Sequence, residues 1–423
     1  MYRTEHDQWT IALAPDMTEE YLSIPFAVDE NTAAIHVRLE DPPASPAIID
    51  IGLQDPERIR GWSGGSRSEY SLGLQSATPG YLAGPLPPGP WAVLLGLYRL
   101  PHSKTDMHLH VTRDVWVPGW IPGDLHAHSE HSDGEWDIPT LVSQAISQNL
   151  EFLALTDHNT SSQNFRGSQE NTTLTLISGM EWTTYHGHAN IWGLKDPLPD
   201  WRVRDAQELQ QKRDQVLAAG GLVSINHPFD RFQPGILWEW PKTGMSAVEI
   251  WNGPWRPSNQ EATDWWTNRL NQGERIIAVG GSDVHGPSTL VRIGEPTTWA
   301  YVEKPGETGI LDAIRQGRVY LTDNPKGPTL RLSPHQLGDV VDSSNPIQVT
   351  LGNLESGDRV RWLSALRVLK EESAAGDTLT STWTPHGDEQ YIRLEVHRWR
   401  PDWDVWLPRL IANPIYIHSR RPS

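Results

Sequence analysis

The chain has 423 residues, with 35 Lys and Arg against 53 Asp and Glu and no cysteine. A formal net charge of −18 without a basic cluster argues against nucleic acid as a partner. Without cysteine, disulfides are excluded and a metal site must use nitrogen and oxygen ligands. No run approaches the roughly 18 apolar residues of a membrane helix, and the start lacks an apolar signal core. We expect a cytoplasmic protein of two or three domains that does not bind membranes.

The first part of the chain has the pattern of β-strands. Residues 35–40 and 107–112 alternate between apolar and polar side chains, and turn-rich segments lie between them. We therefore predict an N-terminal β-sandwich over residues 1–116. His108 and His110 share the polar face of one predicted strand and have no carboxylate or further histidine run beside them in the sequence. We interpret this pair as a solvated strand face rather than a metal site.

The middle part, predicted to span residues 117–325, alternates short apolar runs with helical patterns. The helices are expected over 137–149, 204–219 and 258–271. Alternation of this kind is typical of a mostly parallel sheet or barrel. From residue 326 the helical pattern disappears, and residues 347–351 and 391–396 again alternate. The remainder, 326–423, is therefore predicted to be a second small β module.

Histidine or a carboxylate follows each apolar run of the middle part. These runs cover 152–156, 174–177, 222–225 and 276–279, and one motif precedes them. Because residues just past the ends of parallel strands meet on one face, we expect the polar side chains to converge. The set is His126, His128, Asp133, His158, Glu181, His227, Asp283 and His285. Imidazole and carboxylate together suit Zn, Mn or Fe, and such charges are costly to bury unpaired. The pattern predicts a metal centre, in which Asp157 is expected to orient a neighbouring ligand.

The ordered series DLHAHSEHSDG, LTDHN, GMEW, NHP and GSDVH resembles the motifs of the PHP (polymerase and histidinol phosphatase) superfamily. The resemblance extends over residues 119–323. The flanking GWSGGSR, PGPW and NPIYI resemble the carbaryl-hydrolase-like (CehA/McbA) branch. This likeness implies an α/β fold, a distorted (β/α)7 barrel flanked by two small β-sandwich modules. It also implies a centre of two or three divalent ions. Members of the superfamily include phosphoesterases, and the branch includes a carbamate ester hydrolase.

The resemblance also implies how the ligands are shared among the ions. One ion would take His126, His128, Glu181 and Asp283. A second would take Asp133, His158 and the bridging Glu181. A third would take His227, His285 and a histidine from the segment 185–188, where His188 is preferred and His186 is the alternative. Other PHP members have histidine at the place of Asp133.

The expected activity is hydrolysis by a hydroxide that two ions about 3.5 to 4 Å apart share. Glu181, Asp133 and Asp283 are the expected catalytic carboxylates. A serine or cysteine nucleophile is not signalled. A phosphoesterase is the leading interpretation, and a carbamate or carboxylic ester hydrolase is the alternative. The rival from another class is a non-catalytic metal-bound scaffold whose β modules bind glycan or protein.

The expected partner is a small-molecule ester, in the leading case a phosphorylated one. Arginines beside the predicted strand ends, Arg166, Arg231 and Arg292, are candidates to bind an anionic group. Further candidates for substrate contact are Asn159, Trp182, Trp251 and Asn252.

Overall fold

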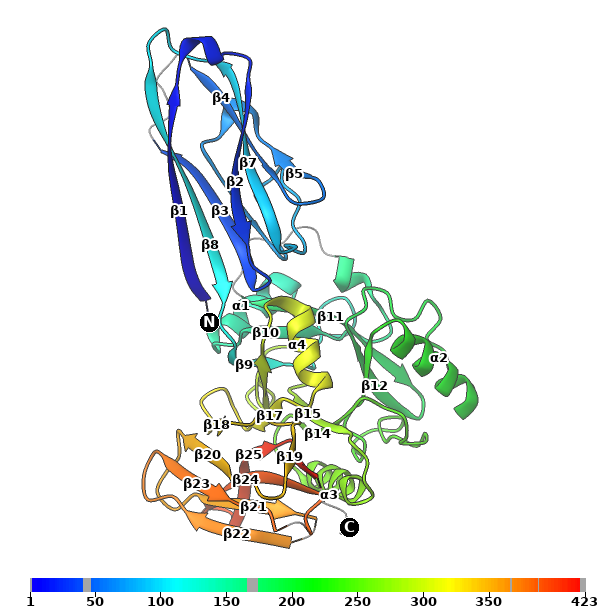
Figure 1. Ribbon diagram of the computed structural model, residues 1–423. Coiled ribbons are helices and arrows are strands. Elements are labelled where there is room, and N and C mark those ends of the chain that lie inside the picture. The colour runs from blue at the N-terminus through cyan, green and yellow to red at the C-terminus, as the bar shows by residue number, and fades with distance from the viewer. Residues whose placement is uncertain (1, 41–46, 166–173, 366, 387, 419–423) are drawn as a thin grey trace. The chain divides into compact units, whose positions relative to one another are not determined.

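The computed structural model describes residues 2–40, 47–165, 174–365, 367–386 and 388–418 (Figure 1). The chain divides into two compact units. One contains residues 1–119 together with 303–309, and the other contains residues 120–166, 174–302 and 310–423. The three-part division with boundaries at 116 and 325 stays a prediction.

The first unit is built from two four-stranded antiparallel sheets, β1-β8-β3-β6 and β2-β7-β4-β5. The strands are β1 (Tyr2–Leu13), β2 (Tyr21–Val28), β3 (Thr32–Glu40), β4 (Ile48–Gln54), β5 (Ile59–Trp62), β6 (Glu69–Gly73), β7 (Gly89–Arg99) and β8 (Thr105–Trp116). Short 3-10 helices occupy Pro15–Met17 and Gly64–Ser66. The two sheets enclose one apolar core.

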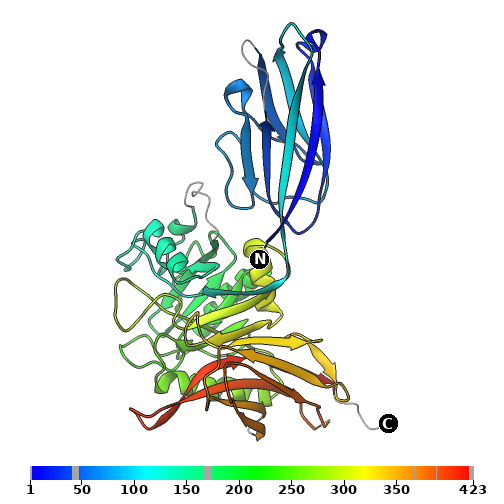
Figure 2. The same ribbon diagram turned by 90° about the vertical axis from the view of Figure 1, so that its left-hand side faces the viewer.

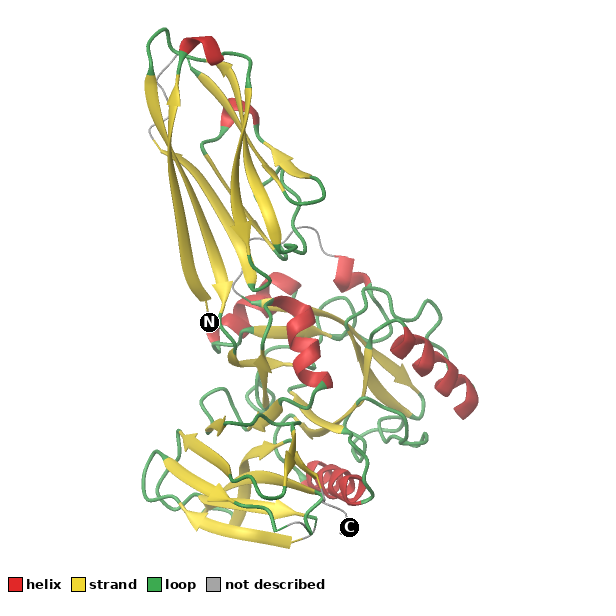
Figure 3. Ribbon diagram, viewed as in Figure 1, coloured by secondary structure: helices red, strands yellow, loops and turns green. Residues whose placement is uncertain are grey.

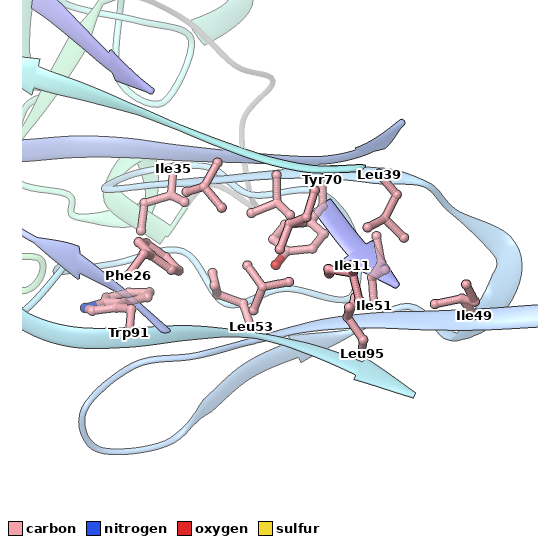
Figure 4. Close-up of a cluster of buried hydrophobic side chains, with 14 of the residues drawn as sticks. Ile11, Phe26, Ile35, Leu39, Ile49, Ile51, Leu53, Tyr70, Trp91 and Leu95 are labelled. Carbon is pink, nitrogen blue, oxygen red and sulfur yellow. The ribbon is translucent and has the colours of Figure 1, made fainter. Parts of the chain in front are cut away.

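That core forms because apolar residues alternate along the strands. In β3, Ile35, Val37 and Leu39 are buried, whereas His36 and Arg38 between them are less buried. Figure 4 shows Ile35 and Leu39 among the side chains of this core, with Phe26 and Trp91 close to one another. Period-two alternation therefore selects which face of each sheet is buried.

The histidine pair of β8 lies on the polar face of the first sheet, but its surroundings differ from those expected. His108 contacts the Thr10 hydroxyl, with 3.1 Å between Nδ1 and Oγ1. His110 Nε2 lies 2.6 Å from Glu40 Oε2, and its Nδ1 lies 3.4 Å from His6 Nε2. Strand pairing brings this carboxylate and this imidazole together from distant parts of the sequence. Among the described residues, no cluster of three or more metal-ligating side chains includes either histidine of the pair.

A buried ion pair joins Asp55, which follows β4, to Arg60 of β5. Arg60 Nη1 donates to Asp55 Oδ2 at 3.1 Å and to the Pro85 carbonyl, and Arg60 Nη2 donates to the Leu82 carbonyl. Burial acts to raise the pKa of Asp55, but backbone N–H groups and the guanidinium of Arg60 lower it. Removing one partner leaves the other charge buried and unpaired.

Substituting Asp55→Ala is therefore expected to destabilise the sandwich by about 3 to 5 kcal/mol. Urea unfolding of the full chain measures the effect. The matched control is Arg38→Ala in the exposed Arg38–Glu40 pair, where a change below about 1 kcal/mol is expected. Equal effects of the two substitutions would contradict the role given to the buried pair.

The second unit contains a long mixed sheet. Its first nine strands follow the order β15-β14-β13-β12-β11-β10-β9-β16-β17. Their bounds are β9 (Gly119–Asp124), β10 (Phe152–Leu155), β11 (Thr175–Thr184), β12 (Gly187–Trp192), β13 (Leu222–Ile225), β14 (Ala247–Asn252), β15 (Ile277–Gly281), β16 (Thr297–Val302) and β17 (Val319–Thr322). Strands β9, β10 and β11 pair in parallel, as do β13, β14 and β15. Strand β12 is antiparallel to both neighbours, which departs from the expected strand–helix alternation.

A closed (β/α)7 barrel is not shown by the strand pairing of the described residues, which is an open path. The chain past two strand ends nevertheless comes together. His128 N donates to the Val284 carbonyl at 3.0 Å, and Asp283 N donates to the His126 carbonyl at 2.9 Å. The segments after β9 and β15 thus lie side by side, and both carry predicted metal ligands.

Helices are few beside the strands (Figure 3). The predicted helices correspond to α1 (Ile138–Ser147), α2 (Ala206–Ala218) and α3 (Pro257–Asn271), and α4 (Gly306–Arg315) and a 3-10 helix at Ser162–Phe165 are additional. Asp137 and Asp205 cap α1 and α2 by accepting hydrogen bonds from Thr140 N and Glu208 N. No helix in the described part of the chain has the length and apolar character that a membrane span requires.

The C-terminal strands form two layers around an apolar core that includes Trp362 and Val349 (Figure 2, orange to red). One layer is β18 (Thr329–Ser333), β20 (Ile347–Gly352) and β23 (Leu379–Trp383). The other extends the long sheet through β17, β25 (Val405–Ala412), β24 (Tyr391–Arg400), β21 (Arg359–Ser364) and β22 (Arg367–Ser373), and β19 (Val340–Asp342) pairs with β26 (Ile415–His418). Strands β25, β24, β21 and β22 thus continue the sheet of the middle region.

Candidate metal centre

Most of the predicted ligands of the second unit lie beyond the strand ends. His126 and His128 follow β9, His158 follows β10, His227 follows β13, and both Asp283 and His285 follow β15. Glu181 and His188 instead lie inside β11 and β12. In this hairpin Thr183 pairs with His188 and Glu181 pairs with Asn190, so these side chains share one face.

Glu181 is the centre of the cluster. Its Oε1 lies 3.2 Å from His126 Nε2, 3.2 Å from His188 Nδ1 and 3.4 Å from His227 Nε2. Its Oε2 lies 2.7 Å from His158 Nδ1 and 3.5 Å from His128 Nε2. The carboxylate is fully buried. The two oxygens of Glu181 are thus surrounded by imidazoles that follow three strands, β9, β10 and β13, and by one imidazole from β12.

Two aspartates complete the cluster. Asp283 Oδ1 lies 3.1 Å from His128 Nε2 and 3.3 Å from His126 Nε2. Asp133 Oδ1 lies 3.4 Å from His285 Nε2, and its Oδ2 lies 3.6 Å from His158 Nε2. The side chain of Asp133 is 58% exposed, so it is the member of the cluster most accessible to solvent.

Four overlapping groups within this cluster have ligand atoms close enough to share an ion. They are His128, Asp133, His158 and His285; His126, Glu181 and His227; His126, His128 and Asp283; and His158, Glu181 and His188. The third set implied by the resemblance, in which His285 joins His227 and His188, differs from this grouping. His285 stacks on His128 with 4.1 Å between ring centroids and turns toward Asp133 instead. His186 lies apart and contacts Glu239 at 2.7 Å, whereas His188 belongs to the cluster.

Several buried polar atoms of the cluster have no hydrogen-bond partner within the part of the chain that the structure describes. They are His126 Nε2, both ring nitrogens of His128, Glu181 Oε2 and His227 Nδ1. Leaving such atoms unsatisfied is costly in a protein interior. Because all are nitrogen or oxygen atoms beside further carboxylates, the residues fit a site for divalent ions of the Zn, Mn or Fe type.

The electrostatics of the cluster are those of closely packed opposite charges. Burial acts to raise the pKa of Glu181, but His126 and His188 hold it well below its usual range. Burial likewise acts to lower the pKa of His126, but the carboxylates of Asp283, Glu249 and Glu181 raise it well above its usual value. For His285, burial is outweighed by Asp133 and Asp283, which raise the pKa to about 9.

A cleft of 860 Å³ opens onto the cluster. Its lining includes Asp133, His158, Glu181, His188, His227, Asp283 and His285 from the cluster. Around them it has apolar side chains such as Phe229, Phe232, Ile236 and Leu290, and two arginines, Arg231 and Arg256. A partly apolar cleft with a few convergent polar groups is the usual form of a small-molecule site.

Only some of the residues predicted to contact the substrate line the cleft. Asn252 lines the cleft, but Trp251 and Asn159 are not among the described residues that line it. Trp251 is 2% exposed and packs against Trp255, because a β-bulge between Glu249 and Trp251 turns the neighbouring Asn252 to the site. Asn159 forms hydrogen bonds with the backbone of Thr183.

Trp182 also lies away from the cleft. It is fully buried and donates to the Trp201 carbonyl. Since side chains alternate along β11, a site-facing Glu181 requires that Trp182 point to the opposite face. Period-two alternation therefore removes it as a substrate contact.

The arginines predicted to bind an anionic group also differ in whether they line the cleft. Arg231 lines the cleft, where its guanidinium binds both carboxylate oxygens of Glu261 at 3.1 and 3.0 Å. Arg292 is 60% exposed, is not among the described lining residues and lies 3.9 Å from Glu295. Arg166 falls outside the described residues.

Some residues around the centre were not predicted. Arg256 lines the cleft and donates to Asp230 and Asn252. Asn226 Nδ2 donates to Glu181 Oε1 at 2.8 Å. Glu249 accepts a hydrogen bond from His126. The sequence offers one signal for each of the last two residues. Asn226 directly precedes the histidine of the NHP motif. Glu249 is the one charged residue of the strand β14.

Asp157 has a role different from the expected orientation of a ligand. It accepts hydrogen bonds from Ser129 N, Ser129 Oγ and Ser132 Oγ. These bonds fix the loop that carries Asp133, so Asp157 holds the backbone and the serine hydroxyls of this loop and not an imidazole.

Residues 124–243 match the family model described as PHP domain. The chain contains a PHP domain. The match covers less than a third of the chain, and it includes the motifs from His126 to His227 but not Asp283 or His285. No curated protein matches the chain. Nothing in these matches concerns the carbaryl-hydrolase-like branch, which stays a prediction.

Three of the solved structures that match the chain are the following. A two-domain protein from Bacteroides vulgatus, described as containing a predicted PHP-like metal-dependent phosphoesterase, is 18% identical, with 69% of this chain and 95% of that chain covered and a TM-score of 0.41. A candidate metal-dependent phosphoesterase from Bifidobacterium adolescentis is 16% identical, with 41% and 90% covered and a TM-score of 0.31. An amidohydrolase from Chromobacterium violaceum, solved with bound sulfate and no metal, is 16% identical, with 48% and 97% covered and a TM-score of 0.28.

Proposed function

We propose that the protein is a phosphoesterase that depends on a centre of two or three divalent ions of the Zn, Mn or Fe type. The observation that carries this proposal is the convergence of imidazoles and two aspartates around the buried Glu181, at the floor of a cleft. A structural metal site is closed and four-coordinate. A larger ligand set that opens onto an 860 Å³ cleft favours catalysis over a scaffold role.

The proposed ligands are His126, His128, Asp133, His158, Glu181, His188, His227, Asp283 and His285. Divalent ions held there would supply Lewis-acid chemistry by acidifying water and polarising the ester group. Glu181, with imidazoles on both oxygens, would hold two ions together. Asp133 is exposed at the cleft and lies near His158 and His285, so it is placed to accept a proton from the attacking water. Asp283 is held by the Asn252 amide at 3.4 Å.

The substrate class rests on the lining of the cleft. Arg231 is tied to Glu261 by an exposed ion pair, and such pairs are worth only about 0 to 1 kcal/mol. Its guanidinium can therefore exchange Glu261 for a phosphate at little cost. The apolar side chains Phe229, Phe232 and Leu290 favour the second candidate, a carbamate or carboxylic ester, for which a neutral cleft is better suited.

Substituting Arg231→Ala tests the choice between these substrates. For a phosphoesterase we expect kcat/KM on p-nitrophenyl phosphate to fall by about 30- to 150-fold, equivalent to 2 to 3 kcal/mol for a charge-assisted contact. The rate on p-nitrophenyl acetate should change little. The control is Arg292→Ala, which lies outside the described cleft lining and should leave both rates unchanged.

An equal loss on both substrates, or no loss on either, would favour the carbamate or carboxylic ester alternative. If the metal-loaded protein turns over neither substrate and chelator treatment changes nothing, the scaffold interpretation gains.

A further inference from the structure

Glu249 is a buried carboxylate that is not one of the proposed ligands but contacts one of them, His126. It lies in β14 with 3% exposure. Its Oε1 is 3.0 Å from His126 Nδ1, and its Oε2 accepts from His227 N at 2.9 Å and from Asn252 Nδ2 at 3.1 Å. A buried carboxylate is tolerated only when hydrogen bonds of this kind satisfy it.

These hydrogen bonds join segments that are distant in the sequence. His126 follows β9, His227 follows β13, and Asn252 ends β14. Asn252 extends the connection, because its Nδ2 also lies 3.4 Å from Asp283 Oδ2. One carboxylate therefore links the segments that carry three of the proposed ligands.

The contact to His126 determines which ring nitrogen is free. A carboxylate can only accept a hydrogen bond, so Nδ1 of His126 must carry the proton and donate it in the hydrogen bond to Glu249. The other nitrogen, Nε2, faces Glu181 Oε1 at 3.2 Å and Asp283 Oδ1 at 3.3 Å. Hydrogen bonds of this type fix the tautomer and orientation of metal-ligating histidines.

The contact to His227 acts on the backbone. His227 has a φ of 28° and Asp283 a φ of 58°, values that L-residues rarely adopt. Such conformations cost of order 1 to 3 kcal/mol and persist only when their surroundings hold them. The hydrogen bond from His227 N to Glu249 is one such restraint at the residue that presents the imidazole.

The His126–Glu249 pair has room to form because the residue packed against it, Gly281, has no side chain. A Cβ on Gly281 would lie 2.3 Å from His126 Cβ and 3.0 Å from Glu249 Oε1. The glycine of the GSDVH motif therefore allows the imidazole and the carboxylate to meet, and any larger residue would displace one of them.

We propose that Glu249 is a positioning residue, which sets the tautomer of His126 and the backbone at His227 and thereby the affinity of the centre for divalent ions. The inference rests on the proposed metal centre, but it is independent of the substrate class.

The test is the near-isosteric substitution Glu249→Gln. An amide offers one acceptor and one donor, so it cannot accept from all three partners. We expect zinc affinity, measured by competition with a chromogenic chelator, to fall by about 10- to 100-fold. Gly281→Ala should lower affinity as well, because it disturbs the same pair. The control is Glu395→Gln, which alters a buried carboxylate of β24 bound to Arg393 and should leave zinc affinity unchanged.

A second measurement separates positioning from loss of charge. Nitrogen-15 NMR of the histidine rings in the zinc-loaded wild-type protein should show His126 protonated at Nδ1, and this signature should be lost in Glu249→Gln. A wild-type His126 protonated at Nε2 would overturn the proposal, even if the variant failed to fold. So would reduced affinity with an unchanged tautomer, or unchanged affinity. A wild-type protein that binds no zinc would instead overturn the proposed metal centre itself.

Discussion

Substituting Glu181→Gln is expected to lower turnover by more than about 100-fold and to reduce the bound metal per chain. Changes in groups that only orient a ligand already cost about 10- to 100-fold, and Glu181 contacts five imidazoles directly. The amide keeps the shape of the side chain but removes the negative charge. It also replaces one acceptor oxygen with a donor that faces imidazole nitrogens.

Elemental analysis after growth in metal-supplemented medium, together with kcat, measures both effects. Glu395→Gln is again the matched control, since it removes a buried carboxylate without touching the cluster. A Glu181→Gln protein with full metal content and near-normal kcat would contradict the proposed bridging role. Loss of turnover with full metal content would place Glu181 in the reaction but not in metal retention.

Metal affinity is expected to rise steeply with pH, by about tenfold per pH unit for each proton displaced. Burial acts to lower the pKa of His285, but Asp133 and Asp283 raise it to about 9 in the chain without metal. The pKa values of His126, His158 and His227 are also raised, because carboxylates outweigh their burial. An imidazolium must lose its proton before it can bind an ion, so affinity should increase from about pH 6.5 to pH 9.

The stability of chelator-treated protein should depend on pH in the opposite direction, because one contribution to it is lost as pH rises. His285 has a folded-state pKa above the unfolded value near 6.5, so its ion pair with Asp133 contributes fully below that pH. The contribution is lost as pH rises through about 9. Since the His285 side chain is 40% exposed, solvent screening limits it to about 1 kcal/mol. Thermal unfolding of chelator-treated wild-type and His285→Ala proteins at pH 6 and pH 9.5 measures this effect. A difference between the two that does not shrink with pH would contradict it.

The sequence predicts where the cluster lies because residues that can bind a metal follow the apolar runs that form strands. Each apolar run of the middle part ends near a ligand-type residue, and those ends do meet, as shown for His126, His158, His227 and Asp283. The topology was harder to predict. An antiparallel β12 between parallel neighbours has the same apolar composition as a parallel strand, so periodicity alone does not distinguish them.

Residues that support the site were missed for a different physical reason. Glu249 is embedded in the apolar run of β14 and acquires its partners only through contacts with residues far away in the sequence. Trp251 was expected at the cleft because it stands at a strand end, but a bulge shifted the alternation by one residue. Such register changes depend on tertiary packing, which a single sequence does not reveal.

The β11–β12 hairpin makes one proposed ligand depend on turn length. His188 reaches Glu181 because Thr183 pairs with His188 across a turn that spans only Tyr185 and His186. In a hairpin, a slip of one residue moves every side chain to the opposite face. A single-residue insertion or deletion in this turn would therefore exchange His188 for a neighbour while the ligands on the other strand ends stayed in place. Through this turn, evolution can add or remove one ligand of the centre without rebuilding the rest.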